Sequence, residues 1–266
     1  MSGVDRNRVN AADRAKPPLL DPTQSALFLD FDGSLVDIAP TPDAIDVPED
    51  LPQLLRALDW QFNGALALVS GRAAADLMRY LPDLSCAMAG SHGAELRLKG
   101  KKPRRLAGPS SDQLAELVRK IHALAARHPG LLVEEKPKGV TLHYRAAPDL
   151  QQELTGSCEK LLPLAFGFEL HHGKCVLEFR PKGVSKAKAV SYFIEQACFF
   201  GRQAIFIGDD TTDEEAMEWV NANGGISIKI GEGESCAQFG FAAPVDLRDW
   251  LCRLLDPAAA KATSKG

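Results

Sequence analysis

The sequence has no pair of cysteines at the spacing that binds zinc or forms a redox motif, and it has no long apolar run. Its apolar stretches fall short of the roughly 18 to 20 residues that a membrane helix needs, and no G-x-G-x-x-G segment follows an expected strand. These absences argue against a membrane span, a dinucleotide-binding site and a C-x-x-C zinc centre. The cysteines stand apart from one another, as expected for reduced thiols of a cytoplasmic protein: Cys86, Cys158, Cys175, Cys198, Cys236 and Cys252.

The charge of the chain is close to balanced, with 31 basic and 35 acidic residues and a net charge of −4 at pH 7. Such a balance gives no general attraction to nucleic acid or to anionic membranes, so neither is expected as a partner. Any anionic ligand must therefore be held by local charges. We expect a monomer whose partner is a small molecule.

Both ends of the sequence are typical of tails rather than of folded segments. Residues 1–24 carry acidic residues and lack the apolar region of a signal peptide, so we expect a flexible N-terminal tail and a cytoplasmic location. Residues 259–266 are expected to form a second, short tail.

Strands and helices alternate through the first hundred residues and again near the end. The runs SALFLDF and ALALVS are continuously apolar, which is typical of strands buried on both faces. Between them, the leucines of LPQLLRAL recur at helical spacing and indicate one buried helix face. The later runs QAIFIG and GISIKI are again typical of strands. The pattern predicts an α/β core of residues 25–105 and 183–258, with a parallel sheet flanked by helices.

The segment of residues 106–182 follows a different order. It contains a long helix that begins near Ser110 or Ser111, a hairpin at LLVEE-KPKG-VTLHYR, a second helix at PDLQQELTGSCEKLLPLA, and a second hairpin at FGFEL-HHGK-CVLEFR. Two helices and two hairpins make a small α+β unit that is large enough to stand as a domain. We therefore expect this segment to be a second domain inserted into the first.

Polar clusters follow three expected strands of the core. The first strand is followed by DFDGS, the second by SGR, and a later strand by GDDTTDE. Because ligands bind beyond the carboxyl ends of parallel strands, these clusters are expected at one edge of the sheet. Lys186 begins the helix before the later strand, so it is expected near the same edge.

The acidic residues at this edge are suited to a hard cation. Asp30 and Asp32 lie at one strand end, and Asp209 and Asp210 lie at another. Their carboxylate oxygens are the ligands that Mg²⁺ prefers, and a cation would offset the repulsion between neighbouring carboxylates. With a serine, an arginine and a lysine beside them to hold an anion, these residues predict metal-assisted phosphoryl transfer.

Each motif has a simpler explanation when it is taken alone. Asp-Gly is common in turns, and DFDGS could begin a calcium-binding loop, but Leu35 and Thr41 stand where that loop needs glycine and glutamate. Thr212 could begin a helix with Glu215 as its partner in a capping box, although the paired aspartates before it are then unexplained. The motifs together, in this order and at matching strand ends, favour the phosphoryl-transfer site.

The segments DFDGSL, SGR, KGVSK and GDDTTDE resemble the four motifs of phosphatases of the haloacid dehalogenase (HAD) superfamily. The segments AGSHGAE, VEEKPKGVTLHYR and GKCVLEFRPKGVSK narrow the resemblance to bacterial trehalose-6-phosphate phosphatases, over residues 25–255. The resemblance implies a HAD-like Rossmannoid core, an inserted cap that recognises the sugar, Mg²⁺ as the cofactor, and hydrolysis of trehalose 6-phosphate. A HAD phosphatase for another sugar phosphate and a non-catalytic trehalose 6-phosphate-binding protein are the alternatives.

The resemblance also implies a role for individual residues. Asp30 would be the nucleophile, and Asp32 the general acid and base. The metal would be held by the side chains of Asp30 and Asp209, by the backbone carbonyl of Asp32, and by Asp210 or Asp213 in support. The phosphate would be held by Ser70, Lys186 and Gly33. The rest of the substrate would contact Arg72 and His92 from the core and Glu134, Lys136 and Glu178 from the cap.

Overall fold

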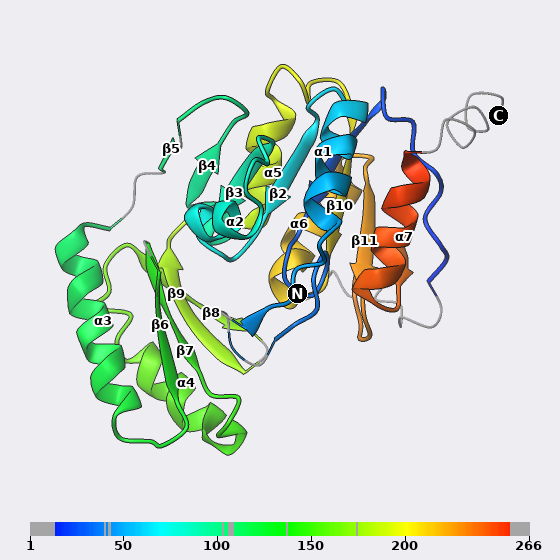
Figure 1. Cartoon of the computed structure of the whole chain (residues 1–266). Helices are drawn as coiled ribbons and strands as arrows, with labels where there is room; N and C mark the ends of the chain where they lie inside the picture. Colours follow the sequence, from blue (N-terminus) through cyan, green and yellow to red (C-terminus); the bar gives the residue numbers. More distant parts are fainter. Residues whose placement is uncertain are drawn as a thin grey trace. The chain divides into compact units, whose positions relative to one another are not determined.

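The computed structural model describes residues 14–39, 41, 44–102, 104–105, 109–136, 138–173 and 175–255. By its internal contacts the chain divides into two compact units, whose elements are drawn in Figure 1. The first, here called the core unit, comprises Met1–Arg104 and Ser185–Gly266. The second, here called the inserted unit, comprises Arg105–Val184.

The core unit is built on an eight-stranded sheet in the order β12-β11-β10-β1-β2-β3-β4-β5. The strands from β12 to β3 pair in parallel, and β4 pairs with β3 in the antiparallel sense. The strands are β1 (Ser25–Leu29), β2 (Leu66–Val69), β3 (Ala87–Gly90), β4 (Glu95–Arg97), β5 (Arg104–Arg105), β10 (Gln203–Gly208), β11 (Ile226–Ile230) and β12 (Phe239–Phe241).

The middle of this sheet is β1, whose residues SALFL are all buried. Leu27 of β1 lies opposite Ile205 of β10 on one side and Leu66 of β2 on the other. A strand with neighbours on both sides and helices on both faces buries every side chain, which explains its continuously apolar sequence. The chain order changes direction at β1, because β2 and β3 follow on one side while β10 and β11 follow on the other. In parallel sheets this switch point is where ligands bind.

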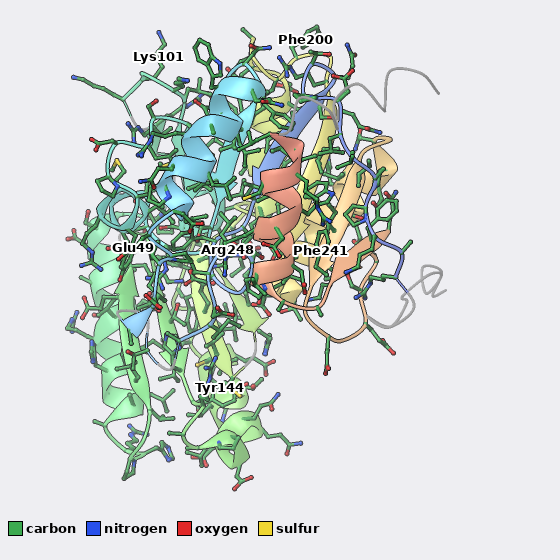
Figure 2. The ribbon with its side chains drawn as sticks, turned by 45° about the vertical axis from the view of Figure 1, so that its right-hand side comes forward. Glu49, Lys101, Tyr144, Phe200, Phe241 and Arg248 are labelled. Atoms are coloured by element: carbon green, nitrogen blue, oxygen red, sulfur yellow. The ribbon has the colours of Figure 1, made fainter. Side chains whose placement is uncertain are left out.

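Helices cover both faces of the core sheet, with α1 and α7 on one face and α5 and α6 on the other (Figure 1). The leucines predicted for one face of α1 are buried. On α7, the ring of Trp250 lies 5.9 Å from that of Phe241, and Arg248 donates to the carbonyl oxygen of Leu35; Figure 2 labels Phe241 and Arg248. The helices are α1 (Leu51–Gln61), α2 (Ala74–Tyr80), α5 (Lys186–Ile194), α6 (Thr211–Ala222) and α7 (Pro244–Leu254).

The inserted unit packs two helices against one face of a four-stranded antiparallel sheet, in the order β6-β7-β9-β8. Its own hydrophobic core includes Leu117 of α3 and Phe179 of β9. Ser110, one of the two capping residues that the sequence left open, caps α3 by accepting a hydrogen bond from the backbone nitrogen of Gln113. The elements are α3 (Ser111–Ala125), β6 (Leu132–Lys136), β7 (Gly139–His143), α4 (Gln151–Glu159), β8 (Phe168–Gly173) and β9 (Val176–Pro181).

The predicted fold class, an α/β core with an inserted α+β unit, is confirmed. One expectation about its elements is wrong, and three strands were missed. Helix α4 ends at Glu159 and not near Ala165, because Pro163 lacks the amide hydrogen that a continuing helix needs. The short strands β4, β5 and β12 were not predicted at all. Among the described residues, no helix combines the length and the apolar composition needed to cross a membrane.

Part of the expected N-terminal tail contacts the core unit. Ala15 forms a parallel bridge with Phe239, and Leu20 is buried. Residues 14–24 are therefore packed, because the backbone at Ala15 pairs with β12 and Leu20 removes its side chain from water. Residues 1–13 and 259–266 of the expected tails lie outside the described residues.

Candidate active site

The first part of the candidate site is the turn that follows β1. Asp30 comes directly after the strand, donates its backbone N–H to the carbonyl oxygen of Ile207, and is 3% exposed. Gly33 has a φ of +77°, in the left-handed region that glycine adopts without strain. A Cβ atom at Gly33 would collide with the carboxylate of Asp209, so only glycine lets the two turns approach this closely.

The second part is the turn between β10 and α6, which Asp213 holds from inside the helix. The Oδ2 atom of Asp213 accepts hydrogen bonds from the backbone nitrogens of Asp209 at 3.1 Å and Asp210 at 3.0 Å. Helix α6 therefore begins after Asp210 and not after Thr212, and the expected capping box of Thr212 with Glu215 is wrong. The helix starts two residues earlier because Asp210 is its capping residue and Asp213, three positions later, accepts from the backbone N–H of Asp210.

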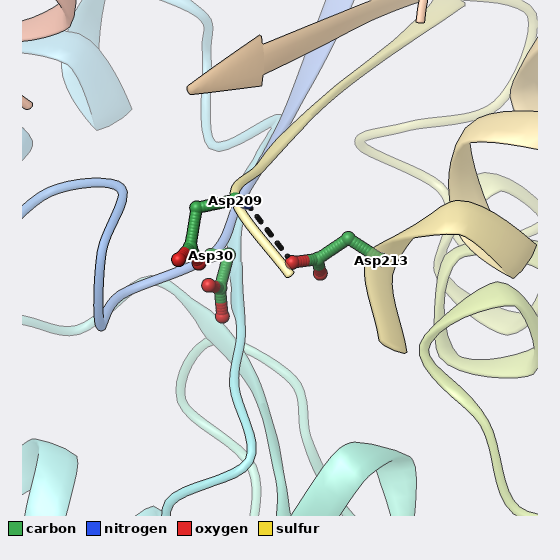
Figure 3. A group of neighbouring side chains, drawn as sticks. All are labelled: Asp30, Asp209 and Asp213. Carbon is green, nitrogen blue, oxygen red and sulfur yellow. Dashed lines mark hydrogen bonds between the residues drawn. The ribbon is translucent and has the colours of Figure 1, made fainter. Parts of the chain in front are cut away.

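Three carboxylates from these two turns meet at one point, as Figure 3 shows for Asp30, Asp209 and Asp213. One oxygen of each lies within 4.8 Å of the others, a spacing that one small cation could bridge. The structure thus brings together Asp30 and Asp209 as the sequence predicted. It places Asp213, the alternative, in the cluster and Asp210 at the start of α6, where Thr211 donates to its side chain.

Lys186 supplies a positive charge to this acidic cluster. Its ammonium nitrogen lies 2.8 Å from Oδ1 of Asp30 and 2.6 Å from Oδ1 of Asp213, and the residue is 3% exposed. Helix α5 begins at Lys186, with Ser185 as the capping residue that accepts from the backbone nitrogen of Lys188. Burial opposes the charge on Lys186, but the carboxylates of Asp213 and Asp30 outweigh it and raise its pKa above the usual value.

Without a cation, the neighbouring carboxylates of the acidic cluster repel one another. Burial raises the pKa of the Asp30 carboxyl well above its usual value; Asp213 and Asp209 add to this shift, while Lys186 opposes it. Burial, followed by the charge of Asp213, raises the pKa of Asp209 to about 7. A divalent cation bound by these oxygens would favour their ionised forms. The donor set, all carboxylate oxygens, fits Mg²⁺.

The loop after β2 brings the other predicted core residues to the same strand ends. Ser70 is fully buried, and its Oγ accepts from the backbone nitrogen of Arg72 at 3.1 Å. The guanidinium of Arg72 binds both carboxylate oxygens of Asp32 at 2.7 Å and lies 5.2 Å from the ring centroid of Tyr80. The carboxylate of Asp32 therefore points to Arg72 and is not part of the acidic cluster, and its expected contribution to the metal site through the backbone carbonyl stays a prediction.

His92 lies behind this loop in a strained backbone. Its φ is +54°, which a residue with a side chain rarely adopts. Its backbone nitrogen donates to the carbonyl oxygen of Ser70, and a Cβ atom at Gly71 would come within 2.6 Å of its ring. His92 is thus packed against the loop that holds Ser70.

The predicted sugar-contacting residues lie together on one face of the inserted sheet. Glu134, Thr141, Glu178 and His171 form a single row across its four strands, one from each strand. Lys136 donates to Glu178 at 2.7 Å, and His143 lies 2.8 Å from Glu134. Burial acts to raise the pKa of Glu134, but the hydrogen bond from His143 and the charge of Lys136 outweigh it and lower that pKa below the usual value.

A separate cavity of about 520 Å³ lies within the inserted unit, between α3 and the edge strand β6. Lys136 and Phe168 are among its lining residues. The acidic cluster belongs to the core unit, so this cavity is not the candidate site.

Sequence reasoning assigned no role to two residues next to these groups. Lys229 of β11 donates to the backbone carbonyl of Asp209, and Thr141 stands between Glu134 and Glu178 in the row described above. The signal for Lys229 was a charged residue in the otherwise apolar end of the strand GISIKI.

Comparison with known proteins identifies the family of the chain. Residues 28–249 match the family described as trehalose-phosphatase. The chain belongs to that family. It is 38% identical over 232 residues to the protein named trehalose-6-phosphate phosphatase of Escherichia coli (strain K12), covering 85% of each chain.

Solved structures support the fold. The crystal structure of a trehalose-6-phosphate phosphatase related protein is 27% identical and superposes with a TM-score of 0.72, covering 91% of this chain and 100% of that one. A haloacid dehalogenase-like hydrolase from Bacteroides thetaiotaomicron, 14% identical, covers 87% of this chain and 97% of that one with a TM-score of 0.62. The HAD-like fold expected from the sequence motifs is confirmed.

Proposed function

We propose that this protein hydrolyses trehalose 6-phosphate to trehalose and inorganic phosphate through a phosphorylated Asp30. Membership of the trehalose-phosphatase family supports the reaction and the substrate. The observation that carries the residue assignment is the cluster in which Asp30 meets Asp209, Asp213 and Lys186. A site with a buried carboxylate, a cation-binding set and a lysine has the parts that phosphoryl transfer needs.

In the first step, a carboxylate oxygen of Asp30 attacks phosphorus and the bond from phosphorus to the sugar oxygen breaks. Asp32 gives a proton to the departing sugar oxygen, which is otherwise a poor leaving group. In the second step Asp32 takes a proton from water, whose oxygen attacks phosphorus and releases Asp30. Because both oxygens of Asp32 accept from Arg72 in this structure, one of these contacts must open before Asp32 holds a proton.

The remaining core residues hold the charges in place. Asp30, Asp209 and Asp213 would bind Mg²⁺, which we propose as the cofactor because their oxygens lie within 4.8 Å of one another. When bound, the cation would neutralise negative charge on the phosphate and on the carboxylates. Lys186, Ser70 and the turn at Gly33 would hold the phosphate oxygens. Asp32 would contribute its backbone carbonyl to the cation, and Asp210 would support the turn from its position at the start of α6.

Residues 25–105 and 183–258 would form the catalytic core, and residues 106–182 the cap that recognises the sugar. The polar row on the inserted sheet supports this, because sugar hydroxyls are recognised by charged and hydrogen-bonding side chains. Glu134, Lys136 and Glu178 would contact the sugar from the cap, and Arg72 and His92 from the core. We also propose a cytoplasmic monomer. Its net charge of −4 gives no general attraction to nucleic acid or to anionic membranes, so neither is proposed as a partner.

The experiment that tests this function is phosphate release from trehalose 6-phosphate by the wild-type protein and by Asp30→Asn, with Mg²⁺ and with chelator. Glucose, sucrose and mannose phosphates serve as competing substrates. We expect rapid, Mg²⁺-dependent release from trehalose 6-phosphate alone, and release by Asp30→Asn at the level of the control without enzyme. The asparagine is close in shape to aspartate, so the variant should keep the circular dichroism spectrum of the wild type.

The other outcomes overturn defined parts of the proposal. Release mainly from another sugar phosphate would keep the chemistry and refute the substrate. Release by Asp30→Asn would refute the covalent intermediate. No release from any substrate, with tight binding of trehalose 6-phosphate, would make the protein a binder and not an enzyme.

A further inference from the structure

Lys229 is a buried lysine next to the candidate site that the proposed reaction does not use. It lies on β11 and is 5% exposed. Its ammonium group donates to the backbone carbonyl oxygen of Asp209 and, at 3.1 Å, to that of Ile230. Burying an ammonium group is costly unless it is paired or hydrogen-bonded, so these carbonyls account for its position in the core.

The strand register determines which peptide Lys229 can reach. Lys229 lies opposite Gly208, the last residue of β10, so its side chain is next to the turn that begins at Asp209. Gly208 cannot carry a side chain there, because a Cβ atom would collide with Asp213. The turn is therefore enclosed by Asp213 and Lys229.

These contacts fix the backbone of Asp209 at both of its polar groups. Its N–H donates to Oδ2 of Asp213 at 3.1 Å, and its C=O accepts from Lys229. With both groups held, the Cα–Cβ bond of Asp209 has a defined direction, and its carboxylate is directed to those of Asp30 and Asp213. Without the lysine contact, only the N–H side of this residue would be anchored by the side chains described.

We propose that Lys229 is a positioning residue that holds the backbone of Asp209 so that its carboxylate completes the cation site. This inference rests on the cation-binding part of the proposed function, and not on the identity of the sugar substrate. Residues that orient metal ligands contribute to affinity without touching the metal, and their removal typically weakens binding by about 10- to 100-fold.

If Lys229 acted on the site only through its positive charge, its removal would change the cation affinity in the opposite direction. A lysine beside the acidic cluster repels a divalent cation, so removing the charge alone would tighten cation binding. Removing a positioning contact would weaken it. The direction of the change therefore separates the two roles.

The test is Mn²⁺ binding to the whole protein without substrate, measured by the electron paramagnetic resonance signal of free Mn²⁺. For Lys229→Met we expect the dissociation constant to rise at least about tenfold relative to wild type. Lys229→Gln, which keeps a donor but no charge, should bind Mn²⁺ more tightly than Lys229→Met. Lys99→Met is the matched control, because it removes a lysine of the core unit that pairs with Asp59 away from the cluster, and its affinity should equal that of wild type.

An unchanged or lower dissociation constant in Lys229→Met would overturn the inference. Circular dichroism and tryptophan fluorescence check folding, and if Lys229→Met does not fold, the same criterion applies to Lys229→Leu, which also removes the donor. If wild type binds no Mn²⁺, the inference and the cation site fall together. If Mn²⁺ binds and no sugar phosphate is hydrolysed, the proposed function fails while the positioning role is still decided by the affinities.

Discussion

Replacing Lys186 with methionine should destabilise the core unit more than most single substitutions. The lysine lies 2.8 Å from Asp30 and 2.6 Å from Asp213, and each of the three residues is at most 3% exposed. Methionine has a similar volume but no charge, so two carboxylates would lie in the core beside an apolar side chain. The cost comes from the uncompensated carboxylates and not from a cavity.

The magnitude follows from the burial of the group. Removing one partner of a buried ion pair costs about 3–5 kcal/mol, because the other partner is left charged and unpaired. Solvent screening is small here, since water reaches little of either side chain. We therefore expect the free energy of unfolding of Lys186→Met to fall by about 3–5 kcal/mol in the presence of chelator.

The double variant Lys186→Met/Asp213→Asn tests the cause. Asparagine at position 213 removes one of the two carboxylates that the loss of Lys186 leaves unpaired. It keeps an oxygen that can accept from the backbone nitrogens of Asp209 and Asp210. The double variant should therefore be more stable than Lys186→Met alone, and the coupling between the two sites should be about 1–3 kcal/mol. Both variants should lack phosphatase activity.

The assay is urea unfolding followed by tryptophan fluorescence. All three tryptophans, Trp60, Trp219 and Trp250, lie in the core unit, so the signal reports on the unit that contains the substitution. A loss of less than about 1 kcal/mol for Lys186→Met would show that the carboxylates do not depend on the lysine. A double variant no more stable than Lys186→Met would show that unpaired buried carboxylates do not cause the loss of stability.

Two further predictions concern the turn at Gly33 and the sugar-contacting face. Gly33→Ala should weaken Mn²⁺ binding at least about tenfold, whereas Gly201→Ala, with the same φ of +77° but open space around it, should leave affinity unchanged. Gly201→Ala should lose about 1–2 kcal/mol of stability from its left-handed backbone alone, and Gly33→Ala should lose more, because its Cβ atom would also collide with Asp209. Equal affinities would remove Gly33 from the cation site. Lys136→Ala should lower the kcat/KM for trehalose 6-phosphate about tenfold or more, because it removes a charge-assisted hydrogen bond. The kcat/KM for a small aryl phosphate should change little. Equal losses for the two substrates would remove Lys136 from sugar recognition.

The strands that position the site could be predicted because buried strands have continuously apolar sequences. β1, β2 and β10 are enclosed by neighbouring strands and helices, so nearly every residue is apolar, and the polar clusters after them are conspicuous. β5 and β12 have two and three residues. Strands this short carry no periodicity and form because a neighbouring strand offers unpaired backbone groups.

The start of α6 could not be decided from its sequence, because DDTTDEE satisfies two capping patterns. Asp210 with Asp213 and Thr212 with Glu215 have the same spacing. The choice depends on where β10 ends, which is set by its register with β1 and β11. That choice also decides whether Asp210 or Asp213, the two alternatives that the sequence left open, lies in the acidic cluster.

The pairing of Arg72 with Asp32 could not be predicted from the sequence, for a different reason. The two residues are 40 positions apart, and nothing local to either predicts a bidentate contact. The sequence could place both at the same sheet edge, since each follows a parallel strand. Which side chains at that edge point to one another depends on packing, including the contact of Arg72 with the ring of Tyr80.

The charges around the acidic cluster explain why its parts must act together. Asp30, Asp209 and Asp213, with the nearby Lys186 and Lys229, carry a net charge of −1 when all are ionised. A phosphate monoester is itself an anion, so this set repels it. A divalent cation would offset the negative charge of the carboxylates and remove much of the repulsion of the phosphate. Lys186 alone does not do this, because it already pairs with Asp30 and Asp213. The site therefore needs the cation before it can hold an anionic substrate.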